Sequence, residues 1–188
     1  MATAPALPLV SVDEYLNSSY EYDMEFVDGM LVERSVPTAF HSLCRRSCSP
    51  HFRALEKEFR IKAMPELRTQ IIERTRYRVP DVLLVTVPFR FGRILTEVPN
   101  AVIEILSPED KLKSVLTRFA DYEGLGVRHL IQMDPEDHVA RRYQNGSLTR
   151  TDFHSLNLPD RPDLPFDSAA IFAQLRQEVS ESDLPENS

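Results

Sequence analysis

The 188-residue chain lacks the features that define several large classes of protein. It has only two cysteines, Cys44 and Cys48, which are too few for a disulfide-stapled scaffold. Its longest mainly apolar runs, at 82–85 and 101–106, fall short of the roughly 18 residues that a membrane-spanning helix needs. The first ten residues have neither the positively charged start nor the cleavage-type ending of a secretory signal. We therefore expect a soluble cytoplasmic protein that does not bind membranes.

Positive charge is also scarce overall, because 22 Lys and Arg stand against 29 Asp and Glu and the formal net charge is -7. This balance argues against a non-specific polycation. Basic residues are nevertheless concentrated between positions 44 and 78, where ten of them face four acids. Such a region could face phosphate, which attracts Lys and Arg whatever the total charge of the protein. It is equally compatible with a solvated helix face that carries ion pairs between neighbouring turns.

Local signals predict the elements of the first half of the chain. Ser11 and Glu14 have capping-box spacing and predict a short helix through about Asn17. Asp28-Gly29 between two short runs predicts a hairpin, because its turn needs positive φ. A helix is expected over 40–59, kinked or divided by Pro50. Strands are expected at about 60–64, 67–73, 78–86 and 101–106.

The second half continues the alternation of helices and strands. A helical stripe covers 110–122, and Gly124 and Gly126 can end that helix. Strands follow at 129–133 and 139–144, then a second hairpin signal at Asn145-Gly146 and a helix over 168–175 capped by Asp167. This order predicts an α/β fold with a central mixed sheet flanked by helices. We expect one domain over 10–176, with a disordered N-terminus at 1–9 and a disordered acidic tail at 177–188.

Two carboxylates lie where apolar strands are expected. Asp81 precedes the run 82–85, and Glu104 sits inside the run 101–106. A carboxylate in a buried strand is costly unless it is paired, hydrogen-bonded or bound to a metal ion. If the two strands are neighbours, the pair would match the preference of Mg²⁺ for carboxylate oxygens. The alternative is structural: Asp81 caps a turn, and Glu104 pairs with a nearby arginine such as Arg78.

The ordered set of motifs along the chain resembles the Uma-type family of restriction-endonuclease-like proteins, of the PD-(D/E)xK nuclease superfamily. The elements that carry the resemblance are Ser11-Val-Asp-Glu-Tyr-Leu16, Glu25-Phe-Val-Asp-Gly29, His41-Ser42, Pro65-Glu-Leu-Arg68, Arg78-Val-Pro-Asp81, Val102-Ile-Glu-Ile-Leu-Ser-Pro-Glu-Asp110 and Tyr122-x-x-x-Gly126-Val-x-x-x-Ile131-x-x-Asp134-Pro. The match covers roughly residues 10 to 175. It implies a restriction-endonuclease-like fold with an N-terminal helix and hairpin, and a divalent-metal site.

The resemblance also implies roles for particular acids and cations. Asp81 and Glu104 would hold Mg²⁺ or Mn²⁺, and Glu25 matches an acidic position often counted with the site, although it could equally be a solvated hairpin residue. The lysine expected two residues after the second acid is Leu106 here. In this family the lysine can instead come from an Asp-x-x-x-Lys element on the following helix. In this chain the two positions of that element hold Ser114 and Arg118. Arg118 keeps the positive charge but cannot act as a base near neutral pH, because a guanidinium stays protonated.

Further basic residues are candidates for contact with substrate. Lys111 is an alternative cation on the same predicted helix as Arg118. His41 could lie near the acidic cluster, and Arg68 could contact phosphate or form a structural ion pair with Glu66. Arg74, Arg76 and Arg78 alternate along a predicted strand, so they would share a face that could follow a nucleic-acid backbone.

These observations predict an endonuclease that hydrolyses DNA phosphodiester bonds with Mg²⁺ or Mn²⁺. The catalytic candidates are Glu25, Asp81, Glu104, Arg118 and Lys111, and the substrate-binding candidates are His41, Arg68, Arg76 and Arg78. A different class remains open: a catalytically degenerate nuclease fold that binds nucleic acid or protein, since Leu106, Ser114 and Arg118 replace expected polar or lysine residues. A third possibility is an interaction domain whose edge strands pair in a homodimer.

Overall fold

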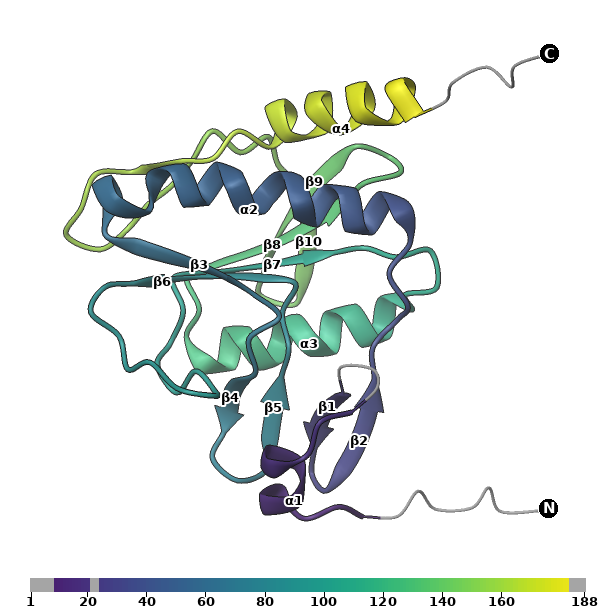
Figure 1. Cartoon of the computed structure of the whole chain (residues 1–188), viewed down its shortest axis with the longest axis vertical. Helices are drawn as coiled ribbons and strands as arrows, with labels where there is room; N and C mark the ends of the chain where they lie inside the picture. The colour runs from purple at the N-terminus through teal and green to yellow at the C-terminus, as the bar shows by residue number, and fades with distance from the viewer. Residues whose placement is uncertain (1–8, 21–23, 183–188) are drawn as a thin grey trace.

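A six-stranded mixed sheet forms the centre of the molecule (Figure 1), as described by a computed structural model that covers residues 9–20 and 24–182. Its strands lie in the order β10-β9-β8-β7-β6-β3. Their bounds are β3 (Ile61–Pro65), β6 (Val82–Thr86), β7 (Ala101–Ile105), β8 (His129–Asp134), β9 (Val139–Gln144) and β10 (Ser147–Arg150). Strands β7 and β8 run parallel and the other neighbours are antiparallel. The mixed sheet expected from the sequence is therefore confirmed.

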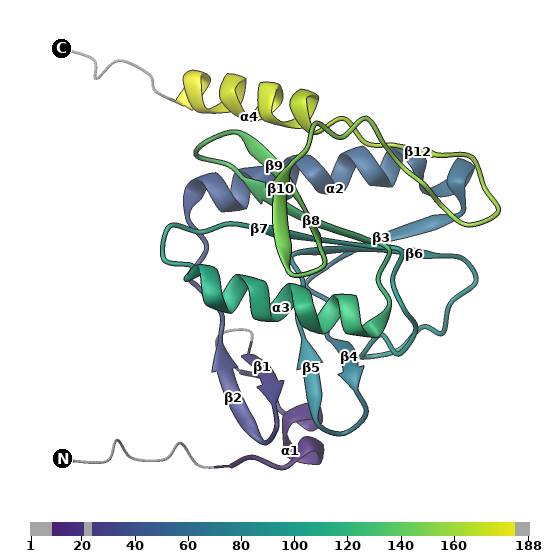
Figure 2. The same ribbon diagram turned by 180° about the vertical axis from the view of Figure 1, so that it is seen from behind.

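Helices cover both faces of this sheet, as the two opposite views show (Figures 1 and 2). On one face lie α2 (Ala39–Phe59) and α4 (Ser168–Ser182), whose apolar residues share a core with β6, β7 and β8. On the other face lies α3 (Leu112–Leu125), which packs through Val115, Phe119 and Tyr122. None of the described helices is both long and apolar enough to cross a membrane. The central strands β6 and β7, which are covered on both faces, are consequently apolar on both faces apart from Glu104 and the terminal Thr86.

A second, four-stranded antiparallel sheet extends from the first. Its strands are ordered β2-β1-β5-β4, with bounds β1 (Met24–Val27), β2 (Met30–Glu33), β4 (Thr69–Ile72) and β5 (Arg76–Arg78). The short α1 (Val12–Asn17) packs on it through Tyr15, which stacks on Phe26 and Tyr77. A small pair, β11 (Ser155–Leu156) and β12 (Leu164–Pro165), precedes α4.

Most local signals are confirmed by the structure. Ser11 caps α1, since its Oγ accepts the Glu14 amide at 3.1 Å. Asp28 and Gly29 form the β1–β2 turn with φ of 51° and 89°, the positive values that this turn requires. Asp167 accepts the Ala170 amide at 3.1 Å, at the start of α4. That helix continues to Ser182, six residues into the stretch expected to be a tail, whereas residues 1–8 and 183–188 lie outside the described residues.

Two expected elements that contain a proline differ from the structure. The helix α2 is not divided at Pro50, because the apolar side chains on both sides of it, including Cys44, Cys48 and Phe52, are held in the same core; a kink there stays a prediction. The expected strand over 78–86 is in fact two strands, β5 and β6. They are separated at residues 79–81, where Pro80 has no N–H to donate to a ladder. The chain passes from the small sheet to the large sheet at this break.

We expect Phe119→Ala to lower the free energy of unfolding by about 3–5 kcal/mol, because the ring is fully buried against Tyr143 between α3 and the sheet. Urea denaturation monitored by circular dichroism measures this change. Phe91→Ala is the matched control, since the ring of Phe91 is 81% exposed. Equal losses in both variants would contradict the packing described here.

Candidate functional site

The two acids singled out in the sequence lie side by side at the junction of the two sheets. Strands β6 and β7 pair with Val82 opposite Ile103, and continuation of that antiparallel register places Asp81 beside Glu104. Both are buried, with exposed fractions of 1% and 3%. Both line one small cavity of about 10 Å³, together with Arg34, His41 and Arg118. The structure thus brings Asp81 and Glu104 together.

Asp81 is held by partners from three different parts of the chain. Its Oδ1 accepts a hydrogen bond from Arg34, and its Oδ2 accepts the Ile105 amide at 2.7 Å. The Nε2 of His41 on α2 lies 3.3 Å from the same Oδ2. Burial alone would raise the pKa of Asp81, but the contacts with His41 and Arg34 outweigh it and lower the pKa to about 2. Asp81 is therefore ionised at neutral pH.

Glu104 has weaker compensation. Its Oε1 accepts a hydrogen bond from the Tyr122 hydroxyl at 2.8 Å, and the Nε of Arg118 lies 3.7 Å from its Oε2. Burial raises the pKa of Glu104 to about 7; the charge of Arg118 opposes this shift and the charge of Asp81 adds to it. Among the described residues, the Nε of Arg118 has no hydrogen-bond partner. Glu104 is thus the carboxylate of the pair that can take up a proton near neutral pH.

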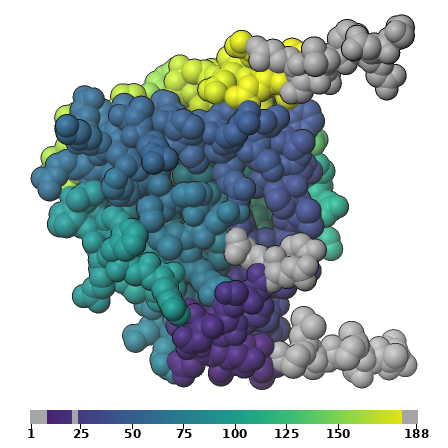
Figure 3. Space-filling model, in the orientation of Figure 1, coloured from purple at the N-terminus to yellow at the C-terminus, as the bar shows by residue number. Residues whose placement is uncertain are grey.

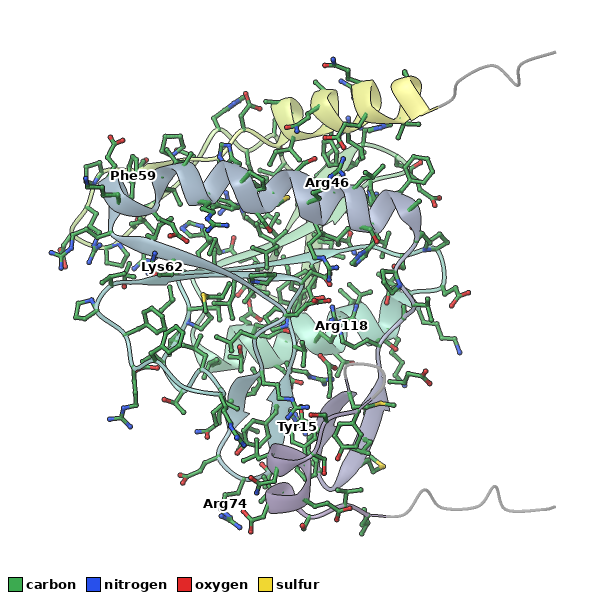
Figure 4. All side chains as sticks on the ribbon, viewed as in Figure 1. Tyr15, Arg46, Phe59, Lys62, Arg74 and Arg118 are labelled. Atoms are coloured by element: carbon green, nitrogen blue, oxygen red, sulfur yellow. The ribbon has the colours of Figure 1, made fainter. Side chains whose placement is uncertain are left out.

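Asp110 connects these residues to the segment that follows the β1–β2 hairpin. Its Oδ1 accepts hydrogen bonds from Ser35 at 3.0 Å and from Arg118 at 3.2 Å, while its Oδ2 accepts the Ser107 amide at 2.9 Å. Figure 4 shows Arg118 near the middle of the molecule, reached from α3. The sequence interpretation had assigned no role to Asp110 or Arg34, although Asp110 ends one of the motifs on which the resemblance was based.

Glu25 belongs to a neighbouring network rather than to the small cavity. It pairs with Arg78, and its Oε1 accepts the Val79 amide at 3.1 Å. Arg78 also donates to Asp121 on α3 at 2.8 and 2.6 Å. Arg76 bridges Asp121 and Asp28 at 2.8 and 2.6 Å. Arg76 and Arg78 therefore share a face, as the alternation predicted, and both join the small sheet to α3 through Asp121. Binding of phosphate by this face stays a prediction, and the 4% exposure of Arg78 leaves little of its surface for it.

Arg68 is also occupied within the protein. Its guanidinium donates to the carbonyls of Tyr15 and Ser18 at 3.2 and 3.4 Å and lies over the ring of Tyr15 at 4.6 Å. The alternative pair with Glu66 is not formed, since Glu66 pairs with Arg45. Contact of Arg68 with phosphate stays a prediction. Arg74 lies in the turn before β5, where it faces Asp13 at the edge of the molecule beside α1 (Figure 4). The basic region 44–78 therefore contributes ion pairs that stabilise the fold.

An open groove of about 360 Å³ adjoins the small cavity. Its walls come from β1, β2 and the start of α3, and they include the exposed Lys111 and Lys113. Ser35, Asp110 and Arg118 line both the groove and the cavity, so the groove leads to the paired acids. The opposite, upper part of the face seen in Figure 3 is covered by α2 (blue) and α4 (yellow). Access from the side of the hairpin is the shorter route to Asp81 and Glu104.

The donor set tests whether a divalent ion fits. Two buried carboxylates from adjacent strands match the oxygen ligands of Mg²⁺ or Mn²⁺. However, the described residues contain no group of three or more His, Cys, Asp or Glu side chains arranged to hold a metal ion. Asp81 already accepts from Arg34 and Ile105, so its oxygens are not free. The acids suit a metal ion chemically, but the ion does not fit while Arg34 pairs with Asp81.

We expect Glu104→Gln to become more stable than the wild type as the pH rises. Because the folded state holds the pKa of Glu104 near 7 and the unfolded chain near 4.5, folding takes up a proton between these values, so wild-type stability falls as pH rises through this window. The difference in free energy of unfolding between the variant and the wild type should grow by roughly 3 kcal/mol from pH 4.5 to pH 8. Denaturation in EDTA at a series of pH values measures it; a difference independent of pH would contradict the assigned burial.

We expect Arg78→Met to lower the free energy of unfolding by about 3–5 kcal/mol, because it leaves the buried Glu25 without its cation and leaves Asp121 with Arg76 alone. Arg74→Met is the matched control, since Arg74 is 65% exposed and its pair with Asp13 lies on the surface. Thermal or urea denaturation compares the two. If Arg78→Met lowers the free energy of unfolding as little as Arg74→Met does, Arg78 is not needed for the fold and is available to bind phosphate.

Comparison with solved structures shows that this fold occurs elsewhere. The crystal structure described as "a putative nuclease belonging to DUF820" from Anabaena variabilis superposes with a TM-score of 0.72 at 20% sequence identity, covering 88% of this chain and 99% of that one. A cryo-electron microscopy structure of a DrdV–DNA complex matches with a TM-score of 0.38 and 16% identity, over 75% of this chain and 12% of that one. The first likeness confirms the fold expected from the sequence.

The family follows from the sequence match. A search of curated proteins found no match. The family model Uma2, described as "Putative restriction endonuclease", matches residues 12–169, which include both acids and every other candidate residue. The match supports a nuclease-type function and confirms the resemblance seen in the motifs. The chain belongs to the Uma2 family.

Proposed function

We propose that this protein is an endonuclease that hydrolyses DNA phosphodiester bonds with Mg²⁺ or Mn²⁺. The single observation that carries the proposal is the convergence of two buried carboxylates, Asp81 and Glu104, on one cavity beside an open groove. Burying two acids side by side is unfavourable for stability even with arginines beside them, and their pKa values are separated to about 2 and about 7. Family membership supports the nuclease type, and DNA as substrate follows from the family description.

Asp81 and Glu104 are the residues that would hold the metal ion. A divalent ion at such a site lowers the pKa of a bound water and offsets phosphate charge during in-line attack. Restriction-endonuclease-like folds generally use divalent metals, which favours this assignment for the two acids. The proposal requires that Arg34 release Asp81, because a carboxylate oxygen that accepts from a guanidinium is not available as a ligand.

Cations at the groove suit a role in binding phosphate. Arg118 points its guanidinium to the cavity between Glu104 and Asp110 and remains charged throughout the physiological pH range. Lys111 is exposed at the start of α3 and lines the groove. We assign to Arg118, with Lys111, the stabilisation of negative charge on the phosphate. His41 orients Asp81 from α2, and Glu25 holds Arg78 in place from outside the cavity.

We expect the purified protein to nick supercoiled plasmid in Mn²⁺ or Mg²⁺ and to stop doing so in EDTA. Asp81→Asn and Glu104→Gln should each reduce the rate at least about a hundredfold, because each removes the charge of a carboxylate that would hold the metal ion while keeping the side-chain shape. Asp152→Asn is the matched control, since Asp152 is exposed. Circular dichroism checks that each variant is folded.

The outcome that would count against the proposal is cleavage that survives Asp81→Asn, or no metal-dependent cleavage of either double- or single-stranded DNA by the wild type. Cleavage that survives Asp81→Asn would come from a contaminating nuclease. No metal-dependent cleavage by the wild type would favour a catalytically degenerate protein, the second candidate function.

A second candidate function has its own supporting observation. The pairs Arg34–Asp81 and Arg118–Glu104 neutralise both acids without a metal ion. This favours a catalytically degenerate member of the family that binds nucleic acid or protein. For the nucleic-acid case we expect DNA binding in EDTA that weakens in Lys111→Ala; an electrophoretic mobility shift tests it.

The single domain, the homodimer and the cytoplasmic location expected from the sequence stay predictions.

A further inference from the structure

Arg34 lies between the β1–β2 hairpin and α2, directly after the last residue of β2. Its side chain is only 16% exposed, and it projects into the cavity that Asp81 and Glu104 line. One terminal nitrogen, Nη2, donates to Asp81 Oδ1. Arg34 therefore brings a positive charge to the acid pair from a segment that is 47 residues away in sequence from Asp81.

The positive charge of Arg34 stabilises the two ionised carboxylates as a bound metal cation would. Two carboxylates in one buried site repel each other, and a positive charge between or beside them lowers that repulsion. Arg34 contacts Asp81, and its charge also favours the ionised form of Glu104. Arg118 supplies the second positive charge, on the Glu104 side. Two acids and two guanidiniums thus leave this part of the site close to neutral.

The space beside the acids is too small for both cations. The cavity of about 10 Å³ has room for roughly one water molecule. Mg²⁺ requires near-octahedral oxygen ligands and usually keeps several waters when it binds to proteins. An ion of this kind can therefore enter only if the guanidinium of Arg34 moves out.

Arg34 has a second acceptor just outside the cavity. Its Nη1 lies 3.7 Å from Glu66 Oε1, and the side chain of Glu66 is 37% exposed. Glu66 also pairs with Arg45 from α2, so the position is already adapted to guanidinium groups. A rotation of the Arg34 side chain toward Glu66 would free Asp81 Oδ1 without leaving Arg34 unpaired.

We infer that Arg34 acts as a built-in cation at the position beside Asp81 that a divalent ion would take, so that ion binding and the Arg34–Asp81 pair exclude each other. The inference rests on the proposed function only in taking Asp81 and Glu104 as the ligands. It makes the acid pair a weak site for divalent ions in the protein without substrate. With Arg34 turned to Glu66 both carboxylates regain free oxygens, so hydrolysis remains compatible with this arrangement.

Binding of Mn²⁺ without DNA tests the inference, because it reads the site independently of activity. The free Mn²⁺ signal in electron paramagnetic resonance, titrated with protein, gives the affinity and the number of sites. We expect Arg34→Met to bind one Mn²⁺ at least about tenfold more tightly than the wild type, since the variant leaves two acids with one fewer cation. Adding Glu104→Gln to Arg34→Met should abolish the gain.

Arg46→Met is the matched control, because it is the same substitution at an arginine that pairs with Glu178 and contacts neither Asp81 nor Glu66. It should bind Mn²⁺ as the wild type does. If Arg34→Met lacks the circular dichroism spectrum of the wild type, Arg34→Gln takes its place in the same titration. A wild type that binds one Mn²⁺ as tightly as the Arg34 variant, with loss in Glu104→Gln, would overturn the inference, as would a variant that gains nothing.

These outcomes are distinct from those of the cleavage assay. Tight Mn²⁺ binding by Arg34→Met without cleavage by either protein would uphold the role of Arg34 and count against hydrolysis. Cleavage by a wild type that already binds Mn²⁺ tightly would do the reverse.

Discussion

Burying a carboxylate is unfavourable unless a cation or a set of N–H donors compensates its charge, and this constraint shapes the centre of the molecule. Three acids are buried where the two sheets and α3 meet, and each has an arginine from another element. The pairs are Glu25 with Arg78, Asp81 with Arg34 and Glu104 with Arg118. They differ in what else compensates the acid. Glu25 and Asp81 each accept a backbone amide, whereas Glu104 accepts only from a tyrosine hydroxyl in addition to its distant arginine.

This difference divides the three pairs into structural and chemical ones. Arg78 is held on both sides, by Glu25 and by Asp121, so it joins β1, β5 and α3 and has no freedom to leave. Arg34 pairs with Asp81 through one nitrogen and lies near Glu66, so its side chain can move from Asp81 to Glu66 and still form an ion pair. Arg118 donates to Asp110 at 3.2 Å and approaches Glu104 at 3.7 Å, and its Nε has no partner among the described residues, so this nitrogen is available to an anion. The chemistry is thus expected at the two loosely held guanidiniums.

The positions of Asp81 and Glu104 could be predicted from sequence because they depend on short-range patterns. The sequence has one acid directly before an apolar run and another within the next such run. These patterns place Asp81 just before a strand and Glu104 within one, and pairing of β6 with β7 brings the two together. The hairpin at Asp28-Gly29 and the cap at Ser11 were predictable for the same reason, since each is set by two to four neighbouring residues. The division at Pro80 was not, because the change of sheet depends on tertiary packing.

The partners of the acids could not be predicted because they come from distant segments. No local sequence pattern marks Arg34 as a site residue. It reaches Asp81 because the residue after β2 lies beside the cavity in the folded chain. The concentration of basic residues in 44–78 even pointed away from it, since Arg76 and Arg78 have acids of their own across the fold.

An arginine at position 118 determines which group of the site can transfer a proton. A lysine there could lose its proton when buried and take part in proton transfer, whereas a guanidinium keeps its charge and offers several donors in a fixed plane. In the proposed reaction Arg118 would bind phosphate through its fixed charge, and the proton that leaves an attacking water would go to another group. Glu104, whose pKa is raised to about 7 while Arg34 pairs with Asp81, is the group at the cavity whose proton affinity suits that role.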